Sequence, residues 1–108
     1  MERRFSSRAR VDIPIRAFID GTSFACRAVD LSATGMVFER SRYLVNRELC
    51  AVSRFEIYLG NRPIRTRGRA VWSRDRLQAV RFVLMHDADR LTIAELLDRM
   101  VQHHQPLH

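Results

Sequence analysis

The sequence predicts an all-β domain, a small antiparallel β-barrel of about six strands with one C-terminal α-helix. Most of the chain alternates apolar and polar residues, which is the pattern of strands that bury one face. Short polar turns separate these alternating segments, and the pattern changes to helical spacing only near the end. Short antiparallel strands in succession usually close into a barrel or sandwich, and a helix can cover an open end.

The first two strands are predicted over residues 11–20 and 22–31. In the first, the odd positions from Val11 to Ile19 are apolar, and Asp20-Gly21 then supplies a hairpin turn because glycine accepts positive φ. The segment "SATG" ends the second strand, and a short third strand follows over residues 36–39. Residues 40–50 show no clean period, so we expect them to be a connection.

The second half of the chain repeats this pattern before it becomes helical. Residues 53–59 alternate, Gly60-Asn61 forms a turn, and residues 62–74 and 77–85 follow as strands on either side of a polar turn. In residues 86–104 the apolar side chains take helical spacing, and Asp87 or Asp89 suits the first turn because an acceptor and a negative charge are both favoured there. The apolar residues at helical spacing are Ile93, Leu97, Met100 and Val101.

Length and composition favour one globular domain. The chain has 108 residues, of which 46% are hydrophobic and 29% charged, so it can bury one core. We expect a flexible arginine-rich lead-in over 1–10, a single domain over 11–102 and a tail over 103–108. There is neither a long apolar run nor a secretory signal, so we expect a cytoplasmic protein without a membrane span. Cys26 and Cys50 are expected to be small buried thiols.

The charge points to an anionic partner. The formal net charge is +7, and all 19 basic side chains are arginine. A guanidinium offers a planar fork that suits phosphate and the O6/N7 edge of guanine. A genome rich in G and C would also favour arginine codons, so global charge alone indicates an anion only weakly.

Two polar segments lie on either side of the first two strands. The lead-in "RRFSSRAR" holds four arginines within residues 3–10, and "DLSATG" spans residues 30–35. Taken alone, the first is typical of a solvated basic tail. The second, taken alone, is typical of a turn in which side chains bond the neighbouring backbone and Gly35 supplies positive φ.

Together and in this order the two segments resemble the PilZ domain family. Arg4 and Arg8 match its RxxxR motif, and Asp30, Ser32 and Gly35 match its D/NxSxxG motif. The resemblance covers nearly the whole chain and implies a PilZ-like barrel that acts as a receptor for the bacterial second messenger cyclic di-GMP. Gln78 and Ala79 stand where family members commonly have glycine, a departure expected to affect packing of that strand more than the ligand site.

The chemistry of cyclic di-GMP gives each of these residues a role. The ligand carries two phosphates and two guanines, so Arg4 and Arg8, with Arg3 as a third cation, are expected to close over it with charge-assisted hydrogen bonds. Asp30 can accept hydrogen bonds from guanine N1 and N2, and Ser32 can bond a base or a phosphate. Gly35 permits a close turn. The resemblance further implies closure of the lead-in on binding, which would present a new surface to a protein partner.

Trp72 is the only tryptophan and leaves two interpretations open. A large aromatic side chain is most often part of the core. A guanine face also needs a flat surface on which to stack, and some PilZ proteins place an aromatic residue on the barrel wall.

The sequence favours a non-catalytic function without a cofactor. It has no phosphate-binding glycine loop, no HExxH and no zinc spacing. One alternative is a PilZ-type adaptor that binds proteins but no nucleotide. Another is a basic barrel for single-stranded nucleic acid, which the scarcity of aromatic residues disfavours. Arg65, Arg67 and Arg69 share one strand face, expected to be solvated or else a docking surface.

Overall fold

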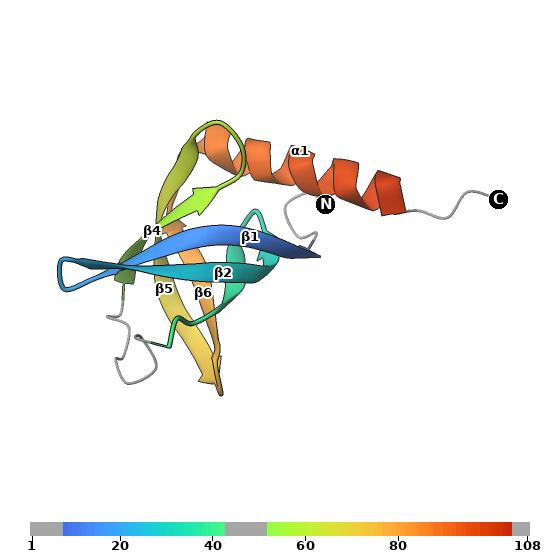
Figure 1. Ribbon diagram of the computed structural model, residues 1–108. Coiled ribbons are helices and arrows are strands. Elements are labelled where there is room, and N and C mark those ends of the chain that lie inside the picture. Colours follow the sequence, from blue (N-terminus) through green and yellow to red (C-terminus); the bar gives the residue numbers. More distant parts are fainter. Residues whose placement is uncertain (1–7, 43–51, 105–108) are drawn as a thin grey trace.

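The computed structural model describes residues 8–42 and 52–104, with side chains up to residue 100. Figure 1 shows strands that curve into a barrel, with one helix lying across an end of it. The elements are β1 (Arg8–Ile19), β2 (Thr22–Ser32), β3 (Gly35–Glu39), β4 (Val52–Tyr58), β5 (Pro63–Arg74), β6 (Leu77–Leu84) and α1 (Asp87–His104). The predicted fold class and the predicted order of elements are therefore confirmed. Most of the expected connection at 40–50, with Cys50, lies outside the described residues.

Every strand pairs antiparallel with two neighbours, and the sheet closes on itself in the order β1-β2-β3-β6-β5-β4. Closure leaves no strand at the edge of the sheet, although the start of β5 extends beyond its ladder with β6. It also places β3 beside β6, so the turn after β2 lies against a strand that is distant in the sequence. This long-range pairing assembles the site described below.

Two tight turns explain how consecutive strands meet. Between β1 and β2, Asp20 and Gly21 both have positive φ, at 52° and 79°, as the type I′ hairpin turn requires. Between β5 and β6, Asp75 has a φ of 54°, and Asp and Asn are among the few side chains that adopt this region readily. The predicted hairpin turns at residues 20–21 and 74–76 are thus confirmed.

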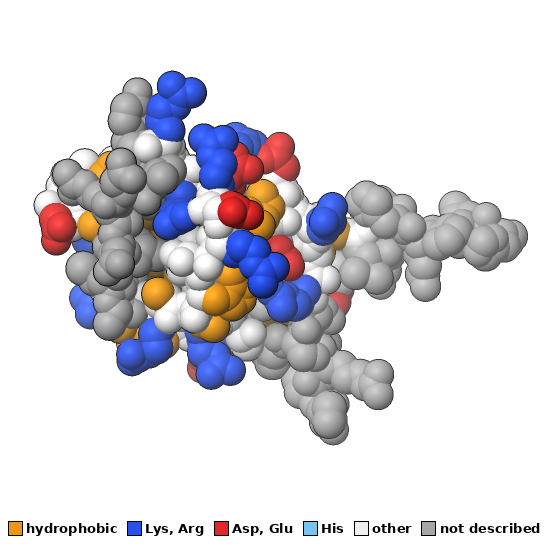
Figure 2. Space-filling model, turned by 90° about the horizontal axis from the view of Figure 1, so that it is seen from below, with side chains coloured by type: hydrophobic (Ala, Val, Ile, Leu, Met, Phe, Trp, Pro, Cys, Tyr) orange, Lys and Arg blue, Asp and Glu red, His pale blue; other side chains and the backbone are white. Residues whose placement is uncertain are grey.

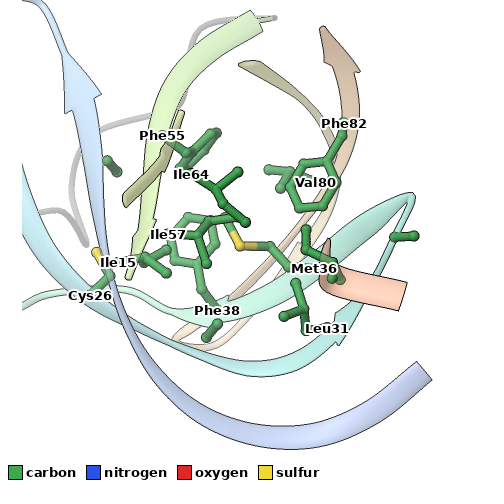
Figure 3. Close-up of a cluster of buried hydrophobic side chains, with 14 of the residues drawn as sticks. Ile15, Cys26, Leu31, Met36, Phe38, Phe55, Ile57, Ile64, Val80 and Phe82 are labelled. Atoms are coloured by element: carbon green, nitrogen blue, oxygen red, sulfur yellow. The ribbon is translucent and has the colours of Figure 1, made fainter. Parts of the chain in front are cut away.

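The core fills the barrel with the alternating residues of the strands. Figure 3 shows side chains from β1 to β6 that point toward one another inside the barrel. Phe38 and Phe55 meet edge to face, with ring centroids 5.5 Å apart. Cys26 is buried as predicted, and burial raises the pKa of its thiol. Gly68 has no side chain because an added Cβ would lie 3.1 Å from Phe55 and 3.2 Å from Val80.

The helix α1 covers one end of the barrel with a narrow apolar stripe. Ile93, Ala94 and Leu97 are completely buried, whereas Leu91 is 41% exposed. No helix in the described part of the chain is long and apolar enough to cross a membrane.

The predicted domain boundaries differ from the structure at both ends. Residues 8–10 were expected to belong to a flexible lead-in, but they are the first three residues of β1. They pair with residues 32 to 30 of β2. The helix runs to His104, so 103 and 104 belong to α1 and not to a tail. Ala9 and Val11 continue the apolar positions of β1 toward the N-terminus. The charged residues Arg8 and Arg10 made this end of the strand resemble a polar tail in the sequence.

Candidate functional site

The turn between β2 and β3 is held by the side chain of its first residue. The Ser32 hydroxyl oxygen accepts hydrogen bonds from the backbone N–H groups of Thr34, at 3.2 Å, and Gly35, at 3.1 Å. The Ser32 side chain is also buried, at 5% exposure. The predicted turn role of Ser32 is therefore observed, and its hydroxyl fixes the position of two backbone amides.

The carbonyl groups of the same turn are held by two distant elements. The Ala33 carbonyl accepts a hydrogen bond from the Arg90 guanidinium of α1 at 2.8 Å. The Thr34 carbonyl accepts one from the Phe82 N–H of β6, also at 2.8 Å. The turn is therefore fixed on both sides, so a ligand would meet a preformed surface.

Gly35 is required for a reason that differs from the predicted one. The expectation that it supplies positive φ is wrong, because only Gly21 and Gly60 among the described glycines have positive φ. Instead, a Cβ at Gly35 would lie 2.5 Å from the Val80 carbonyl oxygen of the paired strand β6. Gly35 thus allows close approach of two backbones at the point where the turn enters the barrel wall.

A β-bulge turns Asp30 away from the core. Before the bulge the even residues of β2 from Phe24 to Ala28 are buried, whereas after it Leu31 is buried. Against β3, Val29 is an extra residue between Ala28 and Asp30, and against β1 the bulge lies in β1, where Val11 and Asp12 together oppose Val29. The extra residue in β2 reverses the side chain direction along the strand. Asp30 consequently lies on the outer side, half-buried, instead of pointing into the barrel.

Asp30 and Arg8 meet across the β1–β2 ladder. One Asp30 oxygen, Oδ2, lies 3.5 Å from the Arg8 guanidinium, and the side chains are 33% and 60% exposed. The other oxygen, Oδ1, is buried and has no hydrogen-bond partner within the described residues. A buried carboxylate oxygen without a donor is costly, so this atom is suited to receive an N–H from a ligand.

Trp72 lies on the surface, so the interpretation of Trp72 as a core residue is wrong. Its side chain is 46% exposed, and a bulge between Ala70 and Trp72 shifts the register of β5 against β6 at this point. The buried side chain of Gln78 donates a hydrogen bond to the Trp72 carbonyl at 2.9 Å. Gln78 thus holds the backbone of β5 at Trp72, and Ala79 is among the residues that line the surface pocket beside Trp72.

A surface pocket of about 280 Å³ brings most of the predicted residues together. It lies where β1, β3, β5 and β6 approach the 32–35 turn, and its wall includes the exposed ring of Trp72. The lining residues are Arg8, Ser32, Thr34, Gly35, Met36, Val71, Trp72, Ala79, Val80 and Arg81. Asp30 does not line the pocket, but it contacts Arg8 at the edge of the pocket. Arg3 and Arg4 lie outside the described residues.

Two arginines at the site were not predicted from the sequence. Arg81 lines the pocket directly opposite Gly35 in the β3–β6 ladder, and Arg90 holds the turn from α1. Alternation on residues 77–85 does place Arg81 on the outer face, but its partner strand was not predictable. Nothing in the sequence near Arg90 indicated a contact with residue 33.

These features define a class of protein: a small closed β-barrel, capped by one helix, with a preformed pocket flanked by arginines where the 32–35 turn meets the barrel wall. The PilZ domain model matches residues 2–99 of the chain. The chain therefore belongs to the PilZ domain family.

Solved structures of similar fold agree with this assignment. The inhibitor of motility MotI (DgrA) of Bacillus subtilis superposes with a TM-score of 0.81 at 13% identity, over 92% of this chain and 51% of MotI. This chain thus spans about half the length of MotI. The PilZ domain of YcgR from Escherichia coli, determined with c-di-GMP, gives 0.64 at 13% identity over 90% of both chains. The PilZ domain of CeSA from a cellulose-synthesizing bacterium gives 0.64 at 15% identity, over 87% and 97%. No curated protein sequence matches the chain.

Proposed function

We propose that this protein is a non-catalytic receptor for cyclic di-GMP and that the pocket beside Trp72 is its binding site. The observation that carries the proposal is the convergence of two distant motifs: Arg8 and the 32–35 turn line one pocket, and Asp30 is paired to Arg8 at its edge. Membership of the PilZ family and the c-di-GMP complex of the YcgR domain support the same ligand.

The cations of the site suit the two phosphates of the ligand. Arg8 is 60% exposed, and among the described residues its one ion-pair partner is Asp30, at 3.5 Å, so its guanidinium is available to a phosphate. Arg81, which also lines the pocket, supplies a second cation. Arg4 precedes Arg8 by four positions, and an extended chain of that length reaches about 14 Å, enough to cross a pocket of this size.

The polar and aromatic groups suit guanine. The Asp30 carboxylate, whose side chain is 33% exposed, can accept the N1 and N2 hydrogens of the base, and its oxygen Oδ1 has no hydrogen-bond partner within the described residues. The exposed Trp72 ring offers a flat face for stacking, a contact that contributes about 1–3 kcal/mol per base. In this proposal Ser32 acts mainly by fixing the turn.

Binding would be signalled through the N-terminal segment. Arg8 begins β1, so a ligand held by Arg8, Arg4 and Arg3 would fix residues 1–7 against the barrel wall and change the surface offered to a protein partner. This partner is proposed on chemical grounds, since the ordering of a segment by charge-assisted bonds is a common switch.

Isothermal titration calorimetry of the full chain with cyclic di-GMP tests the site. We expect Arg8→Ala to lose most binding, about tenfold or more, because it removes a charge-assisted contact to phosphate. Its melting temperature should change little, because the Arg8 side chain is largely exposed and ion pairs at the surface contribute about 0–1 kcal/mol. Arg16→Ala removes an exposed arginine from the same strand and is the matched control.

The outcomes separate the candidate functions. Heat with cyclic di-GMP but none with GTP supports the receptor. Absence of heat with any nucleotide would leave the protein-binding adaptor. Tighter binding to oligo-dT than to cyclic di-GMP would assign the barrel to single-stranded nucleic acid, and equal losses in Arg8→Ala and Arg16→Ala would refute the site.

A further inference from the structure

A row of side chains on the outer barrel wall places like charges side by side. Arg54 of β4 lies directly opposite Arg67 of β5, and Arg67 lies opposite Leu84 of β6. Like charges at directly opposed positions destabilise a sheet. Arg54 is stacked over the Phe18 ring at 4.9 Å, and within the described residues neither Arg54 nor Arg67 has a carboxylate at ion-pair distance. Both guanidinium groups are therefore available to an external anion.

A second hollow, of about 330 Å³, lies at this row and shares no lining residue with the pocket beside Trp72. Its floor is partly apolar, because it includes Leu84, whose side chain is 61% exposed, and Met85. The residues that line it are Arg54, Arg65, Thr66, Arg67, Leu84, Met85 and His86. Arg65 differs from the other two arginines, since Glu56 already pairs with it at 3.3 Å. Figure 2 shows one face of the molecule, on which arginine side chains lie beside exposed hydrophobic ones.

The backbone beside the hollow is paired on one side only. The β5–β6 ladder begins at Arg67 and Leu84, where β6 ends, whereas the β4–β5 ladder continues to Pro63. In the described ladders, β5 from Pro63 to Arg65 thus has β4 as its one partner. Such a strand segment can accept an extended chain alongside it.

From these observations we propose that the hollow binds an extended acidic segment of a partner protein. Two carboxylates of that segment pair with Arg54 and Arg67, and an aliphatic side chain packs on Leu84 and Met85. The charge of the rim selects the acidic partner, and the apolar floor adds contact area that a free anion would not use. The one ring among the lining residues is the imidazole of His86, and no Phe, Tyr or Trp lines the hollow to offer a single-stranded nucleic acid a broad face for stacking. This interface does not depend on nucleotide binding.

Fluorescence anisotropy with a labelled peptide of alternating Glu and Leu, added to the full chain, tests the interface. We expect Arg67→Glu to weaken binding about tenfold or more, since it replaces an attraction by a repulsion. The variant should still fold, because the new carboxylate faces Arg54 and replaces a like-charge pair by an opposite one. Arg74→Glu makes the same charge change at an exposed position near the other end of β5 and is the matched control. Leu84→Ala should weaken binding a few-fold without any change in charge.

The peptide composition and the variants decide the outcome. Binding of the Glu-Leu peptide that falls in Arg67→Glu and Leu84→Ala, and persists in Arg74→Glu, supports the proposal. Equal binding of a Glu-Ser peptide, or equal losses in Arg67→Glu and Arg74→Glu, would reduce the effect to net charge and overturn it. So would tighter binding of labelled oligo-dT at the same residues. Cyclic di-GMP binding is measured in parallel and should be the same in Arg67→Glu as in wild type, so the two proposals can fail separately.

Discussion

At the scale of single residues, the site depends on a glycine that is needed for space. A Cβ at Gly35 would lie 2.5 Å from a backbone oxygen, and a backbone atom cannot turn aside as a side chain can. We expect Gly35→Ala to lower the free energy of unfolding by about 1–3 kcal/mol, because β3 and β6 must separate to admit the methyl group. Denaturation in urea measures this change.

A second glycine provides the control, because it is required for conformation alone. At Gly21 nothing lies within 4 Å of an added Cβ, and its φ of 79° is the constraint. Asparagine tolerates that region, so Gly21→Asn should cost less than about 1 kcal/mol. If Gly21→Asn were as destabilising as Gly35→Ala, close packing of β3 on β6 would not explain the requirement for Gly35.

The ion pair between Asp12 and Arg27 predicts a pH effect beside the bulge in β1. The hydrogen bond from Arg27 is the main cause that lowers the pKa of Asp12 below 3.8, with the charge of Arg27 adding to it. A carboxylate with a lowered folded-state pKa stabilises the fold above its unfolded pKa, and this contribution is lost as pH falls through the folded value. The difference in stability between wild type and Asp12→Asn should therefore be present at pH 6 and vanish at low pH.

Salt provides a check on that difference. Both side chains are exposed, so the contribution is small and screened. A difference between wild type and Asp12→Asn that persisted unchanged below pH 3 or in 1 M salt would contradict the role of the ion pair.

At the scale of the elements, the alternation of side chains was enough to predict each strand, but not the irregularities that create the site. The bulge at Val29 turns Asp30 outward, and the sequence does not indicate it, because it is a property of how β2 pairs with β3. Nor could the sequence distinguish positive φ from close packing at Gly35, since the packing partner Val80 is 45 positions away and meets it only through the closed barrel. The residues at the motif positions were predicted because the spacing within each segment resembles the two motifs of the PilZ family.

Two leucines of α1 that are close in sequence differ in exposure, and we expect their substitution to affect stability differently. Leu97 is completely buried against the barrel end, whereas Leu91 is 41% exposed. We expect Leu97→Ala to cost about 2–5 kcal/mol through lost burial and the cavity left behind. Leu91→Ala, with the same helix propensity change, should cost much less.

The same helix links stability to the site. Arg90 of α1 holds the Ala33 carbonyl of the turn, so loosening α1 should also weaken any ligand bound beside that turn. Thermal unfolding of Leu97→Ala and Leu91→Ala followed by circular dichroism checks the contrast. Equal effects of the two substitutions would mean that α1 is not packed on the barrel as described.

At the scale of the whole molecule, the barrel brings the start of β1, the turn after β2, the last part of β5 and the middle of β6 to one pocket, so a ligand there contacts elements from both halves of the chain. Unfolding disperses these contacts, and a ligand that binds only the folded state must raise the melting temperature. At a concentration of about one hundred times its dissociation constant, cyclic di-GMP should add about 2.7 kcal/mol of stability. For a chain of 108 residues this corresponds to a rise of about 10 °C.

Differential scanning calorimetry measures the shift in melting temperature. Arg8→Ala should show almost none at the same nucleotide concentration, because its affinity is lower while its fold is intact. An equal rise in Arg8→Ala, or an equal rise with GTP, would mean that the nucleotide stabilises the barrel through general attraction to its net charge of +7 and not through the pocket.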